Sequence, residues 1–159
     1  MEPKIIELKE KHLIGISTNM SIANNETKQL WGNFIPRVKD IKHRVNTDKI
    51  SLQEYPVDYF QVFNPTKEFT KWATVEVSSF DNIPNGMNSF ILKSGLYAVF
   101  HYKGSSDDTS IFQYIFSEWI PKSKYRIDNR PHFEVLGKKY VNSNSNSEEE
   151  IWIPITLKA

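Results

Sequence analysis

The chain has 159 residues, a formal net charge of +1 and no cysteine, and 25% of its residues are charged. This length is enough to bury a normal core within one domain. Because cysteine is absent, disulfides, Cys-ligated zinc and thiol catalysis are excluded, and a reducing compartment such as the cytoplasm is expected. The two signs of charge balance and leave no electrostatic footprint for nucleic acid, so we expect no direct DNA or RNA partner.

The N-terminal segment indicates neither secretion nor membrane insertion. Residues 4–10 read KIIELKE and carry charges where a signal peptide needs an apolar run. No stretch of the sequence is long and apolar enough to span a membrane. Aromatic residues are abundant at 13%, which is compatible with either a large core or a pocket for a planar ligand.

The first half of the chain alternates between strand and helix patterns. Apolar residues recur at helical spacing from Leu30 to Ile41, and Pro36 should end or kink this helix because it cannot donate the interior hydrogen bond. Residues 43–54 are polar, and we expect them to be irregular. Strands are expected at residues 4–8, 12–21, 57–63 and 72–77, the last two forming a hairpin.

The second half repeats this order after the turn-like residues 81–86. A helix is expected between Ser105 and Pro121, followed by a strand, a polar loop over residues 138–149 and a final strand. Pro154 within the last strand indicates an edge position or a bulge. The strands of this half are expected at residues 89–92, 96–102, 131–136 and 151–157.

The two halves align with one another as a duplication. Each half reads strand, helix, strand, strand, which predicts an α+β fold with duplicated β-α-β-β repeats in one antiparallel sheet and the helices on one face. We expect a single domain over residues 1–159, with one repeat at about 1–82 and the other at about 87–159. The matching segments are 13–16 with 96–99, 34–37 with 119–122, 59–62 with 132–135 and 75–77 with 153–155.

Strand alternation assigns the predicted sheet two chemically different faces. Phe133 and Val135 fall among the aliphatic residues that the helices would cover, whereas His132 and Glu134 fall on the opposite face. The face with Glu134 also carries the aromatic residues Tyr59, Phe63 and Trp72. Such a face is more typical of a small-molecule site than of a core or a plain solvated surface.

In the alignment of the halves, Gln61 stands where Glu134 stands. One neutral and one charged group at equivalent positions predict that a ligand would be held asymmetrically. Spacing alone leaves a second interpretation open, in which Glu134 faces water or pairs with Lys138 or Arg130.

The second half resembles the GyrI-like, or AraC-type effector-binding, domain family. The resemblance rests on the order and spacing of four segments, and it extends over the whole chain because that family has a duplicated β-α-β-β fold. It implies a domain that binds hydrophobic, often cationic, compounds. The segments are GLYAVF at 95–100, EWIPKS at 118–123, PHFEV at 131–135 and EIWIPI at 150–155.

The resemblance also implies residues for the ligand site. The family's characteristic glutamate, which lies among aromatic residues, corresponds by motif to Glu134, and Trp119 and Tyr97 match two aromatic positions. Tyr59, Phe63 and Trp72 rest on strand alternation alone. For every aromatic candidate, a place in the core is the alternative interpretation.

Three functions remain open from the sequence. The first is a stand-alone cytoplasmic domain, since Met1 lies close to the first strand and leaves no room for a helix-turn-helix region. It would sense or sequester a hydrophobic or cationic aromatic compound. The second is a metal-independent hydrolase of reactive aromatic toxins with Glu134 as general base, an activity associated with some GyrI-like proteins. The third is a module that binds a separate protein partner, as in gyrase-inhibitor members.

Familiar catalytic motifs do not occur in the sequence. It contains no H-E-x-x-H metal motif, no phosphate-binding loop and no G-x-S-x-G elbow. We therefore expect no metal and no cofactor, and we favour binding over catalysis.

Overall fold

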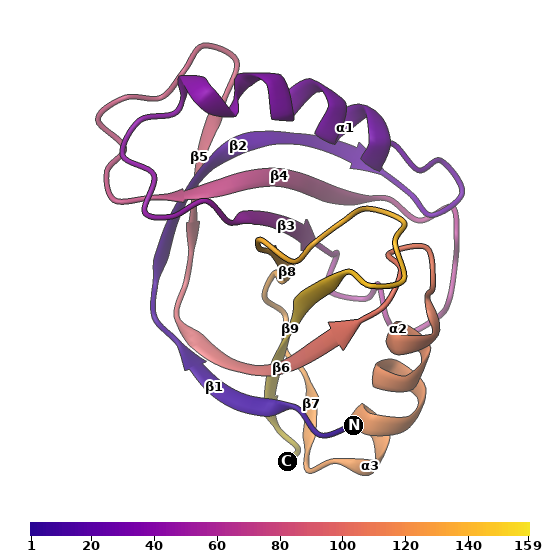
Figure 1. The fold of residues 1–159 in the computed structure, drawn as a ribbon. Coiled ribbons are helices and arrows are strands. Elements are labelled where there is room, and N and C mark those ends of the chain that lie inside the picture. Colours follow the sequence, from indigo (N-terminus) through magenta and orange to yellow (C-terminus); the bar gives the residue numbers. More distant parts are fainter.

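Nine strands curve around a common interior, and the helices lie on the outside of the curve (Figure 1). This computed structural model describes residues 1–159. The strands are β1 Lys4–Leu8, β2 Lys11–Met20, β3 Lys49–Glu54, β4 Phe69–Val77, β5 Asn88–Leu92, β6 Gly95–Lys103, β7 Tyr125–Ile127, β8 His132–Leu136 and β9 Glu148–Leu157. Neighbouring strands pair antiparallel in the order β1-β6-β9-β8-β3-β4-β2-β5, and β7 pairs with β9.

Two helical segments cover the sheet. The first consists of α1 Thr27–Phe34 and the 3₁₀ helix η1 Ile35–Asp40, and the second consists of α2 Ser110–Tyr114, the π-helical turn η2 Ile115–Trp119 and α3 Ile120–Lys122. Pro36 lies at the start of η1, so the prediction that it ends the first helix is confirmed. No helix of the protein is long and apolar enough to cross a membrane.

Buried apolar side chains divide into three clusters, one inside the curved sheet and two between the sheet and the helices. The inner cluster contains Leu52, Trp72, Tyr97 and Phe133. Beneath α1, the side chains of β4 pack against Leu30 and Phe34; these strand residues are Ala73, Val75 and Val77. Beneath the second helical segment lie Ile151, Ile153 and Ile155 of β9. Apolar burial on both faces explains why so many strand residues are hydrophobic.

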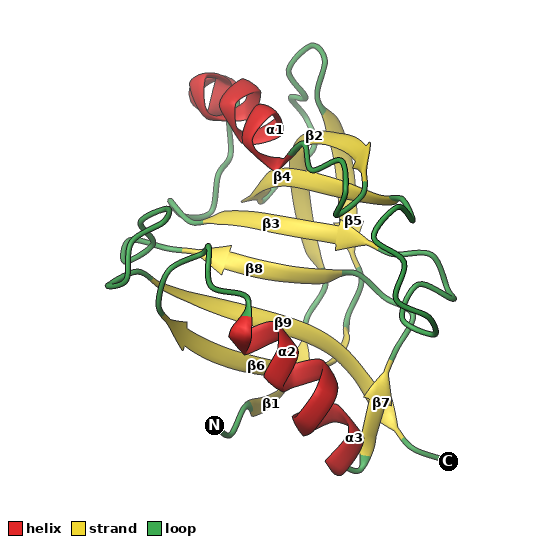
Figure 2. Ribbon diagram, turned by 90° about the vertical axis from the view of Figure 1, so that its right-hand side faces the viewer, coloured by secondary structure: helices red, strands yellow, loops and turns green.

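The predicted fold class is confirmed. The order β2-α1-β3-β4 recurs as β6-α2-β8-β9, the sheet is antiparallel, and both helical segments lie on its outer face (Figure 2). The two halves also exchange strands, because β1 pairs with β6 of the second half and β5 pairs with β2 of the first. This exchange joins the halves at both ends of the strand order.

The strand predicted at residues 57–63 is wrong. These residues form turns in the connection from β3 to β4, where Tyr59 N–H donates to the Pro56 carbonyl at 3.0 Å. The strand lies earlier, at β3, within the segment predicted to be irregular. β3 has buried Ser51 and Gln53 between its apolar residues, so polarity hides its strand pattern.

The corrected strand changes the internal symmetry. Leu52 of β3 lies opposite Phe133 of β8, and each of them also lies opposite a tryptophan on the next strand, β4 or β9. The residue after Leu52 is Gln53 and the residue after Phe133 is Glu134, so Gln53 is the structural counterpart of Glu134. The assignment of that role to Gln61, which lies in the connection, is wrong.

Pro154 does not mark an edge strand, because β9 has neighbours on both sides. On one side β9 pairs with β6, and Pro154 lies opposite Tyr97. On the other side the pairing with β8 ends at Trp152, and the pairing with β7 begins at Ile155. The proline therefore stands where one neighbour replaces another, a position that tolerates its missing N–H.

Candidate functional site

β8 directs Glu134 outward, to the side of the sheet that carries the helices. Glu134 lies opposite Ile151 in the β8–β9 pair, and Ile151 packs beneath the second helical segment. Phe133 and Val135 point the other way and belong to the inner cluster. The predicted faces of this strand were therefore exchanged, because the sequence does not show which residues of β8 and β9 lie opposite one another.

β3 and β8 run between α1 and the second helical segment (Figure 2). Their outward residues are polar, and Ser51, Gln53 and His132 are only 5% or 6% exposed. Glu134 is half-buried beside them. Burial of polar groups costs free energy unless they are satisfied, so a polar set at the centre of a sheet is unusual for a surface that serves only the fold.

Aromatic rings gather on the same side as His132 and Glu134. Tyr55 is in contact with several of them, with ring centroids 4.5 Å from Tyr59 and 4.9 Å from His132. Phe60 stacks on His132 at 5.1 Å and on Phe116 of η2 at 5.1 Å. The β3–β4 connection thus closes against the second helical segment. We call this set the aromatic cluster: Tyr55, Tyr59, Phe60, Phe69, Phe116 and His132.

The Glu134 carboxylate has one direct hydrogen bond, in which Gln53 Nε2 donates to Oε2 at 3.2 Å. Burial raises the pKa of Glu134, while the Lys71 charge and the bond from Gln53 oppose this rise. The carboxylate therefore lies in a place that disfavours its negative charge, and the ionised form would gain from any cation brought close.

A second carboxylate, Glu149, lies beside the first. It is on β9, two residues before Ile151, and therefore faces the same side as Glu134. Burial raises the pKa of Glu149 to about 7, and the negative charge of Glu134 adds to the effect. The Tyr140 hydroxyl, whose pKa is raised chiefly by burial, also feels both carboxylates. Two acids, with Lys71 as the nearby base, leave this place short of positive charge.

His132 behaves as a neutral ring. Burial, followed by the charge of Arg130, lowers its pKa to about 3. At neutral pH it therefore contributes an uncharged aromatic face to the cluster and does not compete with a cation.

Of the six predicted ligand-binding residues, the structure brings Glu134 and Tyr59 to the same place. Phe63 belongs to the same connection as Tyr59, but its side chain is 73% exposed. Trp119 lies on η2 and packs edge-on against Phe100, with centroids 5.3 Å apart.

Tyr97 and Trp72 are in the inner cluster, on the opposite face of the sheet from Glu134. The Tyr97 hydroxyl donates to the Pro131 carbonyl at 2.8 Å. The indole N–H of Trp72 donates to Glu54 at 2.7 Å. These bonds satisfy the polar atoms of both rings within the fold.

Several residues of the site were not among the predictions. Tyr55, Phe60 and Phe69 come from the β3–β4 connection and its end, and Phe116 comes from a helix on which the sequence indicates only a core stripe. The dense aromatic segment YPVDYF at 55–60 was the available signal, and it was attributed to a strand.

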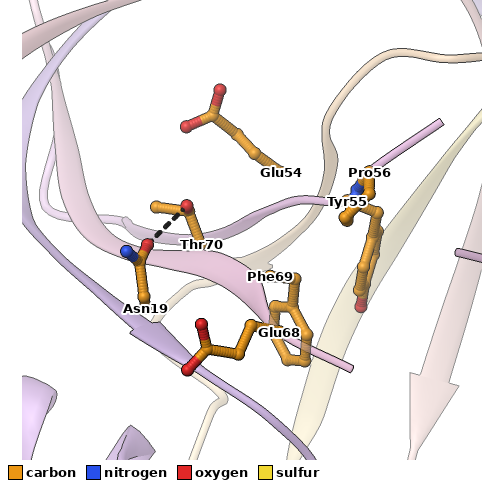
Figure 3. Close-up of a pocket in the computed structure, with 7 residues that line it drawn as sticks. All are labelled: Asn19, Glu54, Tyr55, Pro56, Glu68, Phe69 and Thr70. Atoms are coloured by element: carbon orange, nitrogen blue, oxygen red, sulfur yellow. Dashed lines mark hydrogen bonds between the residues drawn. The ribbon is translucent and has the colours of Figure 1, made fainter. Parts of the chain in front are cut away.

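A surface cavity of about 330 Å³ adjoins the aromatic cluster (Figure 3). In Figure 3 the rings of Tyr55 and Phe69 lie on one side of the cavity, and Glu54 points away from them. Across the cavity, Thr70 Oγ1 donates to Asn19 Oδ1 at 2.8 Å. Because Tyr55 and Phe69 belong to both features, the cavity reaches the edge of the cluster.

The duplicated sheet with its two outer helical segments defines an effector-binding domain of the GyrI-like superfamily. The chain belongs to the Cass2 family, described as integron-associated effector binding protein, whose family model matches residues 4–155. It is similar to the transcriptional regulator BrlR of Pseudomonas aeruginosa, with 27% identity over 157 residues, 98% of this chain and 56% of the regulator. The chain thus spans about half the length of that regulator.

Two solved structures share the fold. SAV2435 bound to tetraphenylphosphonium has a TM-score of 0.69 and 18% identity, covering 98% of this chain and 94% of that one. An integron cassette protein from Vibrio cholerae, VCH_CASS2, has a TM-score of 0.67 and 16% identity, covering 98% of this chain and 97% of that one. Effector binding is therefore the general function of the family to which this chain belongs.

Proposed function

We propose that this protein binds hydrophobic aromatic cations between Glu134 and the aromatic cluster, and so senses or sequesters them. The observation that carries the proposal is a charge without a partner. Glu134 and its neighbour Glu149 lie among buried groups, and the salt bridges of the protein all involve other carboxylates. A cation placed there would supply the missing positive charge.

Aromatic rings around the carboxylate favour a cation with an apolar body. Contact between a cation and an aromatic face contributes about 0.5 to 2 kcal/mol, and the rings also bury the ligand's apolar surface. SAV2435, which shares the fold, was solved with tetraphenylphosphonium, a cation of this kind. That likeness supports the class of ligand proposed for this chain.

Access to Glu134 runs past the β3–β4 connection. Phe60 packs between His132 and Phe116, yet 40% of it is exposed. A ligand with several rings would displace the Phe60 ring and take its place against His132 and Tyr55. The exposed turns of the connection allow this movement without breaking strand pairing.

Isothermal titration with tetraphenylphosphonium tests the proposal. Glu134→Gln keeps the shape of the side chain and should weaken binding by about tenfold or more, which is about 1.4 kcal/mol. Glu118→Gln is the matched control, because it also removes one negative charge but lies on the exposed surface, 2.7 Å from Lys122. Equal losses in the two variants would show a general charge effect and contradict a site at Glu134.

The raised pKa of Glu134 also favours a second candidate, a hydrolase in which this carboxylate acts as general base. The hydroxyls of Tyr55 and Tyr140 lie within its electrostatic reach and could orient a substrate. Detection of hydrolysed product separates the two functions. Turnover that disappears in Glu134→Gln would establish the hydrolase, whereas binding of the cation without product would favour the binding protein.

A further inference from the structure

A cavity of about 280 Å³ lies on the inner face of β8, behind the strand that presents Glu134 outward. Phe133 and Val135 line it, and strand alternation turns them away from the aromatic cluster. The remaining apolar lining comes from the strands that face β8 across the curved sheet and from β9. These side chains are Ile6, Ile50 and Trp152.

The apolar wall of this inner cavity includes a flat aromatic surface. Trp152 and Phe133 stack with centroids 5.1 Å apart and ring planes 18° apart. The indole N–H of Trp152 donates to Glu150 Oε1 at 3.2 Å, so a carboxylate lies at the edge of the ring. Trp152 is half-buried, and a planar ligand could stack within the cavity beside it.

Charged residues at the cavity carry an excess of negative charge. The acidic residues are Glu7, Asp48, Glu76 and Glu150, and the basic residues are Lys9 and Lys11. Lys11 is already paired with Glu76 at 3.1 Å. Four carboxylates against two ammonium groups make this opening attractive to cations.

We propose that the inner cavity is a second small-molecule site, which takes a compact planar aromatic cation. Its volume lies just below the usual range for ligand pockets, about 300 to 1,000 Å³, and therefore suits one or two fused rings. A bulky cation such as tetraphenylphosphonium does not fit. The site is independent of the proposed function, because its residues lie on the other face of β8.

Titration with N-methylquinolinium, read by calorimetry and by quenching of tryptophan fluorescence, tests this site. Val135→Trp fills the cavity and should weaken binding by about tenfold or more. Glu150→Gln removes an exposed charge at the opening without loss of core packing, and should weaken binding by about threefold. The matched control, Glu118→Gln on the distant helix, should leave the affinity unchanged.

The outcomes separate this site from the one at Glu134. Saturable binding that both variants weaken, with weaker binding of neutral quinoline, supports the inner site. Absence of binding overturns it, and so does binding that Val135→Trp and Glu150→Gln leave unchanged, because the cation would then occupy another place. None of these results depends on whether tetraphenylphosphonium binds.

Discussion

Replacement of Glu149 by glutamine should stabilise the fold at alkaline pH and change it little at acid pH. In the folded protein, burial and then the Glu134 charge raise the pKa of Glu149 from 4.5 to about 7. Because the folded state has the higher pKa, it binds more protons than the unfolded state between these values. Stability of the unmodified protein should therefore fall as the pH rises through this interval.

The size of the effect follows from the two pKa values of Glu149, which differ by about 2.5. At about 1.4 kcal/mol for each pKa unit, the upper limit is about 3 kcal/mol. Glu149 is only half-buried, so solvent screening lowers the expected gain to about 1 to 2 kcal/mol at pH values above the folded pKa. Glutamine keeps the shape of the side chain and removes the charge that burial penalises.

Urea unfolding of the two proteins at about pH 5 and about pH 8 measures this gain. The free energy of unfolding of Glu149→Gln should exceed that of the unmodified protein at the higher pH, and the difference should shrink at the lower pH. In a Glu134→Gln background the gain should be smaller, because one source of the raised pKa is gone. An equal change at both pH values would refute the reasoning.

Three further substitutions test the packing that supports the site, each measured by urea unfolding. Phe133→Ala should cost about 3 to 5 kcal/mol, because Phe133 is 1% exposed and its loss leaves a cavity. Tyr97→Phe should cost about 1 kcal/mol, since the Pro131 carbonyl loses its donor, and it should leave cation affinity unchanged. Gly15→Ala should cost about 1 to 3 kcal/mol or more, because the added Cβ would clash with the Ala73 carbonyl oxygen on the paired strand.

Local patterns predict most of the fold. Alternation locates β4, β8 and β9, helical spacing locates both helical segments, and the repeated order predicts the single antiparallel sheet. β3 is not predicted, because Ser51 and Gln53 are buried polar residues that belong to the candidate site and break the usual strand pattern. The failure of local rules at this place is itself an indication of function.

The candidate site could be predicted only in part. The resemblance to a family selects Glu134, and aromatic density points to Tyr59, but the side of the sheet on which they meet depends on strand register. A shift of one residue turns every side chain of a strand to the other face. The sequence also cannot show that Glu149 lies beside Glu134, since 15 positions and a loop separate them.

The position of bound tetraphenylphosphonium in a crystal of this protein tests the central claim most directly. We predict the phosphonium within about 6 Å of the Glu134 carboxylate or of a ring face in the aromatic cluster, with the Phe60 ring displaced. A cation bound in the inner cavity, or on a surface remote from Glu134, would contradict the proposed function.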